Sequence, residues 1–306
     1  MHTSTLKKPC DGGFTFVELL VVLAVLAILS VMLLPAIAGT KPNSQSFQCM
    51  DNQRQLILGW QMYAQDNREL LPPNDYPYTT PYRLSANKHA LYNWVCGTME
   101  QAYDAGFSPE LTDPVGTAMT PYITNAAVYH CPADNYVDVF INTLHVRSYS
   151  MNSAVGTIWS SSSTYGGTAG VLGSPVGGGF LPGQSYNANQ TAWLTYGKMT
   201  SFTHPGPANT FVFMDESPLS INDGALLISA SAAPGATYLI DYPGGNHNGA
   251  TPIAFVDGHV IIHKWQDPRT YSPPISVHGG GGGGTTFQSP DDIDCFFLAP
   301  ITSAAR

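Results

Sequence analysis

Residues 12–38 have the sequence GGFTFVELLVVLAVLAILSVMLLPAIA, which determines the structure expected for the N-terminal part of the chain. Residues 14–38 contain a single charged side chain, Glu18. A helix of that length covers roughly 37 Å, enough to span the hydrocarbon core of a bilayer. Lys7 and Lys8 precede it, and lysines at that place keep the nearby end of a spanning helix in the cytoplasm. The pattern predicts a membrane-inserted helix behind a short basic leader.

Two simpler explanations of this segment, a secretory signal peptide and a plain signal anchor, fit it less well. A signal peptide is cut after a shorter apolar region, whereas this apolar region runs on into Pro35. A signal anchor accounts for the hydrophobicity but not for Glu18, because an unpaired carboxylate in lipid costs several kcal/mol. Glu18 therefore either lies in the interface at a helix end or has a cation as its partner.

Gly13, Phe14, Glu18, the apolar run and Pro35 together resemble the N-terminus of type IV prepilins and type II secretion pseudopilins. The resemblance implies that a prepilin peptidase cuts between Gly13 and Phe14 and methylates the new terminal amine. It equates Glu18 with the family's glutamate and Pro35 with its mid-helix proline, while Asp11 departs from the basic residues the family prefers there. The new ammonium at Phe14 could neutralise Glu18 of a neighbouring subunit, so Glu18 is predicted to act in assembly.

Segments further along resemble a pseudopilin-like family of planctomycete and verrucomicrobial bacteria. The matching segments are CMDNQRQLILGWQMYAQDN (49–67), CPAD (131–134), RSYSMN (147–152), and His247 followed by nine residues and Asp257-Gly258. The two resemblances imply that the partners are prepilin peptidase, other pilin or pseudopilin subunits and inner-membrane assembly machinery. They imply a protein of the cytoplasmic membrane, crossing once, with its C-terminal domain outside the cytoplasm and in the periplasm or on the cell surface after assembly.

The composition limits the classes of partner. Charged residues make up 11% of the 306 residues, the net charge is −9, and only 12 Lys and Arg are present. A chain with so little positive charge has no electrostatic footprint for nucleic acid. Thirty glycines and 24 prolines indicate many turns and long loops, including the six consecutive glycines at 279–284.

The expected fold class is α+β: a long hydrophobic helix, then an amphipathic helix packed on an antiparallel sheet with long loops, as in pilins. Over 44–67 the apolar residues Phe47, Met50, Leu56, Ile57, Trp60, Tyr63 and Ala64 recur at helical spacing. Pro42 predicts a kink or break near 39–43. Strands are expected at 210–216, 237–242 and 251–265, the last being a hairpin that turns at Asp257-Gly258.

The domain division predicted from these patterns is a leader at 1–13, a transmembrane and assembly helix at 14–38, and an extracytoplasmic globular domain at 39–306. Mature residues should form a structural subunit of a type IV pilus or a type II secretion pseudopilus. No GxSxG, HExxH or phosphate-binding loop is present, so the chain is not expected to be an enzyme. The alternatives are a membrane-anchored binding module and a metal-dependent enzyme that uses the region around His247.

The best candidate for a metal site is His247, Asp257, His259 and Asp215, since imidazole and carboxylate groups are common ligands. No cofactor follows firmly from the sequence; if a metal binds in this C-terminal region, calcium or another divalent metal is the candidate ion. The alternative is that Asp257 and Gly258 merely form the turn while His247 bonds to nearby backbone. Beyond the leader there are four cysteines, which are candidates for one or two disulfides in an oxidising compartment. They are Cys49, Cys96, Cys131 and Cys295.

Overall fold

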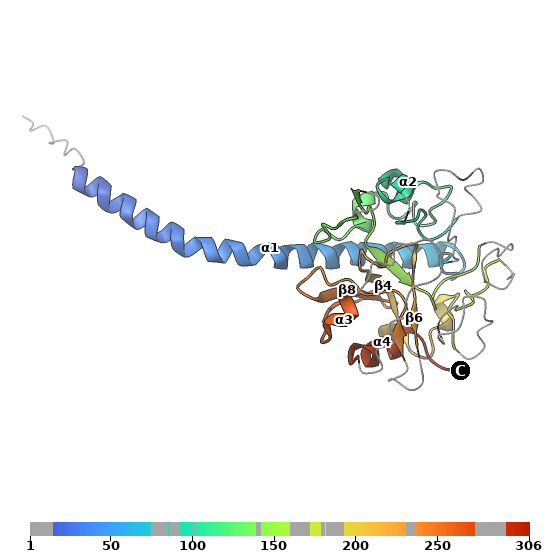
Figure 1. Ribbon diagram of the computed structural model, residues 1–306. Helices are drawn as coiled ribbons and strands as arrows, with labels where there is room; N and C mark the ends of the chain where they lie inside the picture. The colour runs from blue at the N-terminus through green and yellow to red at the C-terminus, as the bar shows by residue number, and fades with distance from the viewer. Residues whose placement is uncertain are drawn as a thin grey trace, which may run out of the picture. The chain divides into compact units, whose positions relative to one another are not determined.

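The computed structural model combines helices with one central sheet, which is consistent with an α+β protein (Figure 1). It describes residues 15–74, 85, 92–100, 102–138, 142–159, 172–178, 181, 193–230, 237–272 and 292–306. Side chains are not described at residues 30–43, 102, 138 and 238. The chain divides into two units, Met1–Ser44 and Gln45–Arg306, and the second contains the sheet. The prediction for the glycines at 279–284 falls outside the described residues.

The longest element is α1, Phe16–Asp66, which is assigned as one helix of 51 residues. Of the kink or break predicted near 39–43, the break is not found, because the helix assignment continues through those residues, and the kink stays a prediction. Proline lacks a backbone N–H, but a single proline removes only one bond from the ladder. After Asp66 the chain leaves the helix through Arg68 and Glu69, both with positive φ.

Within the parts of the chain that the structure describes, no helix has a stretch both long and apolar enough to cross a membrane.

The central sheet has five strands in the order β5-β3-β4-β8-β9. Their bounds are Tyr149–Asn152 for β3, Phe211–Asp215 for β4, Ala225–Leu226 for β5, Ala250–Phe255 for β8 and Val260–Lys264 for β9. The pairs β3–β4, β4–β8 and β8–β9 are antiparallel, as predicted, whereas β5 at the edge of the sheet runs parallel to β3. The predicted hairpin is confirmed: β8 and β9 pair, and Gly258 in the turn has φ +95°.

The remaining described elements are short. They are α2 (Ala102–Ala105), η3 (Ser108–Thr112), η4 (Ala126–Tyr129), β1 (Val137–Asp138), β2 (Thr143–Leu144), η5 (Met199–Ser201), η6 (Pro207–Asn209), β6 (Ile228–Ser229), β7 (Tyr238–Leu239), α3 (Pro268–Tyr271) and α4 (Asp294–Thr302). The strand predicted at 237–242 is β7, which pairs with β6 in a separate ribbon.

One face of the sheet packs against the C-terminal part of α1. Leu56, Ile57 and Trp60 of this helix are fully buried in the same cluster as Phe213 of β4. Gln53 fixes the helix to the sheet, because its Nε2 donates to the carbonyl of Pro252 at 2.8 Å. The predicted amphipathic helix over 44–67 is therefore present and buries one side.

The predicted apolar stripe was wrong at one residue of this helix. Phe47 is 66% exposed. At about 100° per residue, Phe47 lies about 140° from Trp60 around the helix axis, and so faces away from the sheet. Cys49, three turns before Trp60, is instead the first fully buried residue of the stripe.

The other face of the sheet is covered by α4 (Figure 1). Leu298 and Cys295 of this helix share a core cluster with Phe211, Met214 and other side chains of the sheet. The pairing register of β4 with β8 shifts between Phe211 and Phe213. As a result, the side chains of β4 do not simply alternate between the core cluster under α1 and the core cluster under α4. The segment 294–302 near the C-terminus is thus a helix that packs on the sheet.

Candidate functional site

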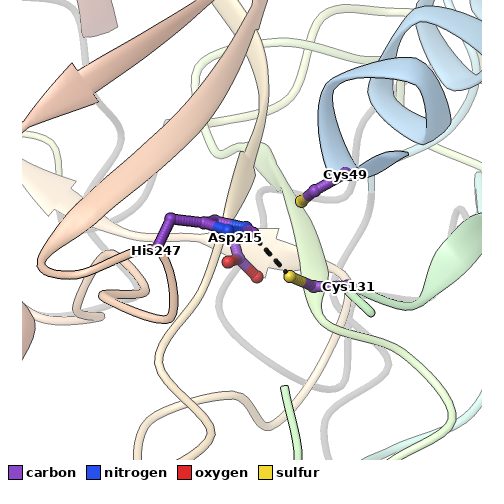
Figure 2. Close-up of side chains that lie close together, drawn as sticks. All are labelled: Cys49, Cys131, Asp215 and His247. Atoms are coloured by element: carbon purple, nitrogen blue, oxygen red, sulfur yellow. Dashed lines mark hydrogen bonds between the residues drawn. The ribbon is translucent and has the colours of Figure 1, made fainter. Parts of the chain in front are cut away.

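Four buried side chains that can bind metal converge between α1 and the sheet (Figure 2). They are Cys49, Cys131, Asp215 and His247. One ligand atom from each lies within 4.8 Å of the others. Cys49, Cys131 and Asp215 are fully buried and His247 is 6% exposed, so the cluster is closed to solvent.

Each side chain comes from a different segment of the C-terminal unit. Cys49 lies on the buried stripe of α1, and Cys131 is the second residue after η4. Asp215 is the last residue of β4, two residues after Phe213, and residues two apart on a strand share a face. His247 lies in the loop before β8, a loop that leaves its turn through Asn248 and Gly249 with positive φ.

Hydrogen bonds hold these side chains in their orientations. His247 Nε2 is 3.2 Å from Cys131 Sγ, and its other ring nitrogen, Nδ1, is 3.0 Å from Ser46 Oγ. Cys49 Sγ is 3.0 Å from the hydroxyl of Tyr149. In Figure 2 the imidazole and the carboxylate lie side by side, opposite the two sulfur atoms.

The carboxylate of Asp215 is incompletely satisfied. Asn246 Nδ2 donates to Asp215 Oδ2 over a long 3.5 Å, and among the described residues Oδ1 accepts no hydrogen bond. A buried carboxylate without full compensation is costly. This carboxylate belongs to the cluster, since one of its oxygens lies within 4.8 Å of a ligand atom of each thiol and of the imidazole.

Burial shifts the pKa of each group toward its neutral form. It raises the pKa of Asp215 well above its ordinary value, raises that of the Cys49 thiol and lowers that of His247. The pKa of Cys131 is also raised, first by its hydrogen bond with Cys49 and then by burial. A closely placed cation would reverse the shifts of the two thiols and the carboxyl group, because it favours their anionic forms, and it would keep His247 neutral.

The structure brings together only part of the metal site predicted from the sequence. Asp215 and His247 meet, but Asp257 and His259 lie in the β8–β9 turn, where they bond to each other at 2.6 Å and are over a third exposed. The Asp257 side chain also accepts from the His259 backbone N–H at 3.1 Å, as in an Asx turn. This pair therefore lies at the turn, whereas the ring of His247 contacts the side chains of Ser46 and Cys131 and not the backbone group that the alternative interpretation expected.

All four described cysteines are unbonded thiols, so the disulfide hypothesis stays a prediction. Cys49 and Cys131 are neighbours in the cluster. Both were candidates for a disulfide, and the structure places both among the possible metal ligands. Cys96 donates to the carbonyl of Glu110 at 2.9 Å, and Cys295 is a core residue on the buried side of α4. The position of Cys49 about three helical turns before Trp60 was the feature of the sequence that could have predicted its burial. No feature of the sequence near Cys131 predicts that Cys131 belongs to the cluster.

A second buried polar group adjoins β3 and was not foreseen. Arg147 is fully buried, and its Nη1 donates to Tyr149 O at 2.9 Å and to Ser150 Oγ at 3.2 Å. Ser150 in turn donates to the carboxylate of Glu216, which also accepts from Ser220 at 3.0 Å. Burial raises the pKa of Glu216 to about 8, although the Arg147 charge opposes the shift.

At the start of α1, Thr15 and Glu18 form a reciprocal cap. Glu18 Oε2 accepts from the Thr15 backbone N–H at 2.7 Å and from its hydroxyl at 2.8 Å, while the Glu18 N–H donates to Thr15 Oγ1 at 3.3 Å. This is a capping box, which satisfies donors at the helix N-terminus. The predicted cleavage residues Gly13 and Phe14 lie outside the described residues, and so does the side chain of Pro35.

Comparison with known proteins identifies one motif. The family model of the prokaryotic N-terminal methylation motif matches residues 8–34. No curated protein sequence and no solved structure matches the chain. The motif gives the chain a prepilin-type N-terminus and supports a type IV pilin-like or pseudopilin protein.

Proposed function

We propose that this chain is a structural subunit of a filament of the type IV pilus or type II secretion pseudopilus class. The observation that carries the proposal is the methylation motif at 8–34, which runs directly into α1. The same helix packs its C-terminal part on the five-stranded sheet.

In this proposal the precursor is anchored in the cytoplasmic membrane by the helix over 14–38, with residues 39–306 outside the cytoplasm. Prepilin peptidase removes residues 1–13, and inner-membrane assembly machinery adds the mature chain to other subunits. No catalytic role is assigned. The four side chains of the cluster around Asp215 are buried and so out of reach of a substrate.

The geometry at Thr15 and Glu18 supports a specific role for the glutamate. Its carboxylate already accepts hydrogen bonds from Thr15, the residue that follows Phe14 in the sequence, and cleavage at Gly13–Phe14 would create the new amine at Phe14. Helix N-termini favour negative charge, and a terminal ammonium adds an ionic partner. Glu18 of one subunit can thus bind the amine of the next in an apolar environment.

Two measurements test this function. Mass spectrometry of the protein from its native host should find a mature chain that begins at Phe14 with a methylated amine. An intact Met1 terminus in the assembled fraction would contradict the prepilin assignment.

The second measurement separates charge from capping. Glu18→Gln keeps an oxygen that can accept from Thr15 but loses the charge, so it should insert in the membrane and fail to assemble. Thr15→Val is the matched control: it removes the hydroxyl of the cap at a cost of about 1 kcal/mol and keeps the charge, so filaments should form. Normal filaments from Glu18→Gln would remove the charge-pairing argument.

A further inference from the structure

We propose that Cys49, Cys131, Asp215 and His247 bind one Zn²⁺ ion that fastens α1 to the sheet. Tetrahedral zinc with sulfur at about 2.3 Å and nitrogen or oxygen at about 2.0–2.2 Å has ligand–ligand edges of about 3.3–3.8 Å. The Sγ–Nε2 distance between Cys131 and His247 is 3.2 Å, and all four ligand atoms lie within 4.8 Å of one another. Small side-chain adjustments suffice to complete the tetrahedron.

The donor set selects the metal. Two sulfurs, one imidazole nitrogen and one carboxylate oxygen suit zinc, whereas calcium and magnesium require oxygen ligands. The calcium expected from the sequence therefore does not fit this cluster. Four protein ligands with no exposed position form a closed site, which is the pattern of structural rather than catalytic zinc.

The surrounding groups complete the site. Ser46 Oγ contacts Nδ1 of His247, which leaves Nε2 to face the cluster. The Tyr149 hydroxyl lies against Cys49 Sγ, and Asn246 donates to the outer oxygen of Asp215. The Tyr149 hydroxyl and the Asn246 amide can both donate hydrogen bonds to negatively charged ligands. They therefore reduce the excess negative charge that remains when two thiolates and a carboxylate surround one divalent cation.

A Cys49–Cys131 disulfide is the competing use of the same cysteines. It would consume both sulfurs and leave the buried carboxylate of Asp215 beside an uncharged imidazole, with Oδ1 still lacking a donor. A divalent cation satisfies all four groups at once. For this reason the convergence of four ligands favours zinc over the disulfide.

The test uses the full-length chain, purified in detergent from cells supplied with zinc, with metal content measured by elemental analysis. One zinc per chain is expected. Cys131→Ser and Asp215→Asn should lose it, whereas Cys96→Ser, a buried cysteine outside the cluster, should retain it. Cobalt exchanged into the wild type should give the visible absorption of a tetrahedral thiolate site, and Cys131→Ser should not.

Folding is controlled in two ways. Circular dichroism of each variant shows whether lost zinc reflects lost structure, and Ser46→Ala tests the site without removing a ligand. Ser46→Ala should stay folded and bind zinc about tenfold to a hundredfold more weakly in competition with a chelator. A folded wild-type chain without zinc, equal zinc in wild type and Cys131→Ser, unchanged affinity in Ser46→Ala, or a Cys49–Cys131 disulfide in the native protein would each overturn the proposal.

Discussion

Glu216 offers a sharp test of the buried electrostatics. The change is Glu216→Gln, which removes the ionisable group but keeps an oxygen that accepts from Ser150 or Ser220. The carboxyl is fully buried, and burial raises its pKa from 4.5 to about 8. In the unfolded chain it is ionised above about pH 5, whereas in the folded chain it keeps its proton until about pH 8.

The direction of the effect follows from this difference. Between the two pKa values the folded state binds one more proton than the unfolded state, so the free energy of unfolding falls as the pH rises. Each full unit of pKa difference is worth about 1.4 kcal/mol. Because of the Glu216 carboxyl, the free energy of unfolding of the wild type therefore falls by about 3 to 4 kcal/mol between pH 5 and pH 8. Above pH 8 this decrease is nearly complete.

The assay is urea denaturation of wild type and Glu216→Gln at several pH values between 5 and 8. Other buried acids such as Asp215 and Asp241 also have raised pKa values, so the difference between the two proteins is the informative quantity. That difference should grow in favour of the variant by about 1 kcal/mol per pH unit. Glu69→Gln, at an exposed glutamate, is the control and should run parallel to wild type. Parallel curves for Glu216→Gln as well would refute the reasoning.

Two further predictions concern packing and the turn. Leu298→Ala in α4 removes a fully buried side chain and should lower the free energy of unfolding by about 2–5 kcal/mol in urea denaturation. Phe296→Ala, on the exposed side of the same helix, should change it by less than about 0.5 kcal/mol. Equal losses in the two variants would contradict the assignment of the buried side. Gly258→Ala forces a side chain onto a φ of +95° and should cost about 1–2 kcal/mol in the same assay, while Gly206→Ala, where a Cβ meets open space, should cost almost nothing. A neutral Gly258→Ala would mean that the turn adapts.

Features with a local or periodic signal were predictable from the sequence. The helical spacing around Trp60 indicated a helix, and the β-branched run broken by Asp257-Gly258 indicated the hairpin. The methylation motif is likewise a short contiguous pattern, so it was found without a fold. Phe47 shows the limit of this reasoning, because spacing alone did not fix which side of the helix faces the sheet.

Strand β3 was less visible, although it is central to the sheet. Its sequence YSMN contains Ser150 and Asn152, both fully buried, and polar residues do not predict a core strand. Their partners make the burial tolerable: Ser150 donates to Glu216, and Asn152 Nδ2 donates to the carbonyls of Phe211 and Thr302. These partners lie tens of residues away, so only the folded chain supplies them.

The sequence by itself determined the prepilin-type N-terminus, the amphipathic helix and the C-terminal hairpin, because each depends on residues that are neighbours along the chain. The tertiary structure decided which polar groups meet. Cys49 joins Cys131, Asp215 and His247 only because α1 lies on the sheet with one particular stripe inward, and because β4 ends opposite the loop that carries His247. Helix packing and strand register are long-range properties, and no spacing within a single segment encodes them.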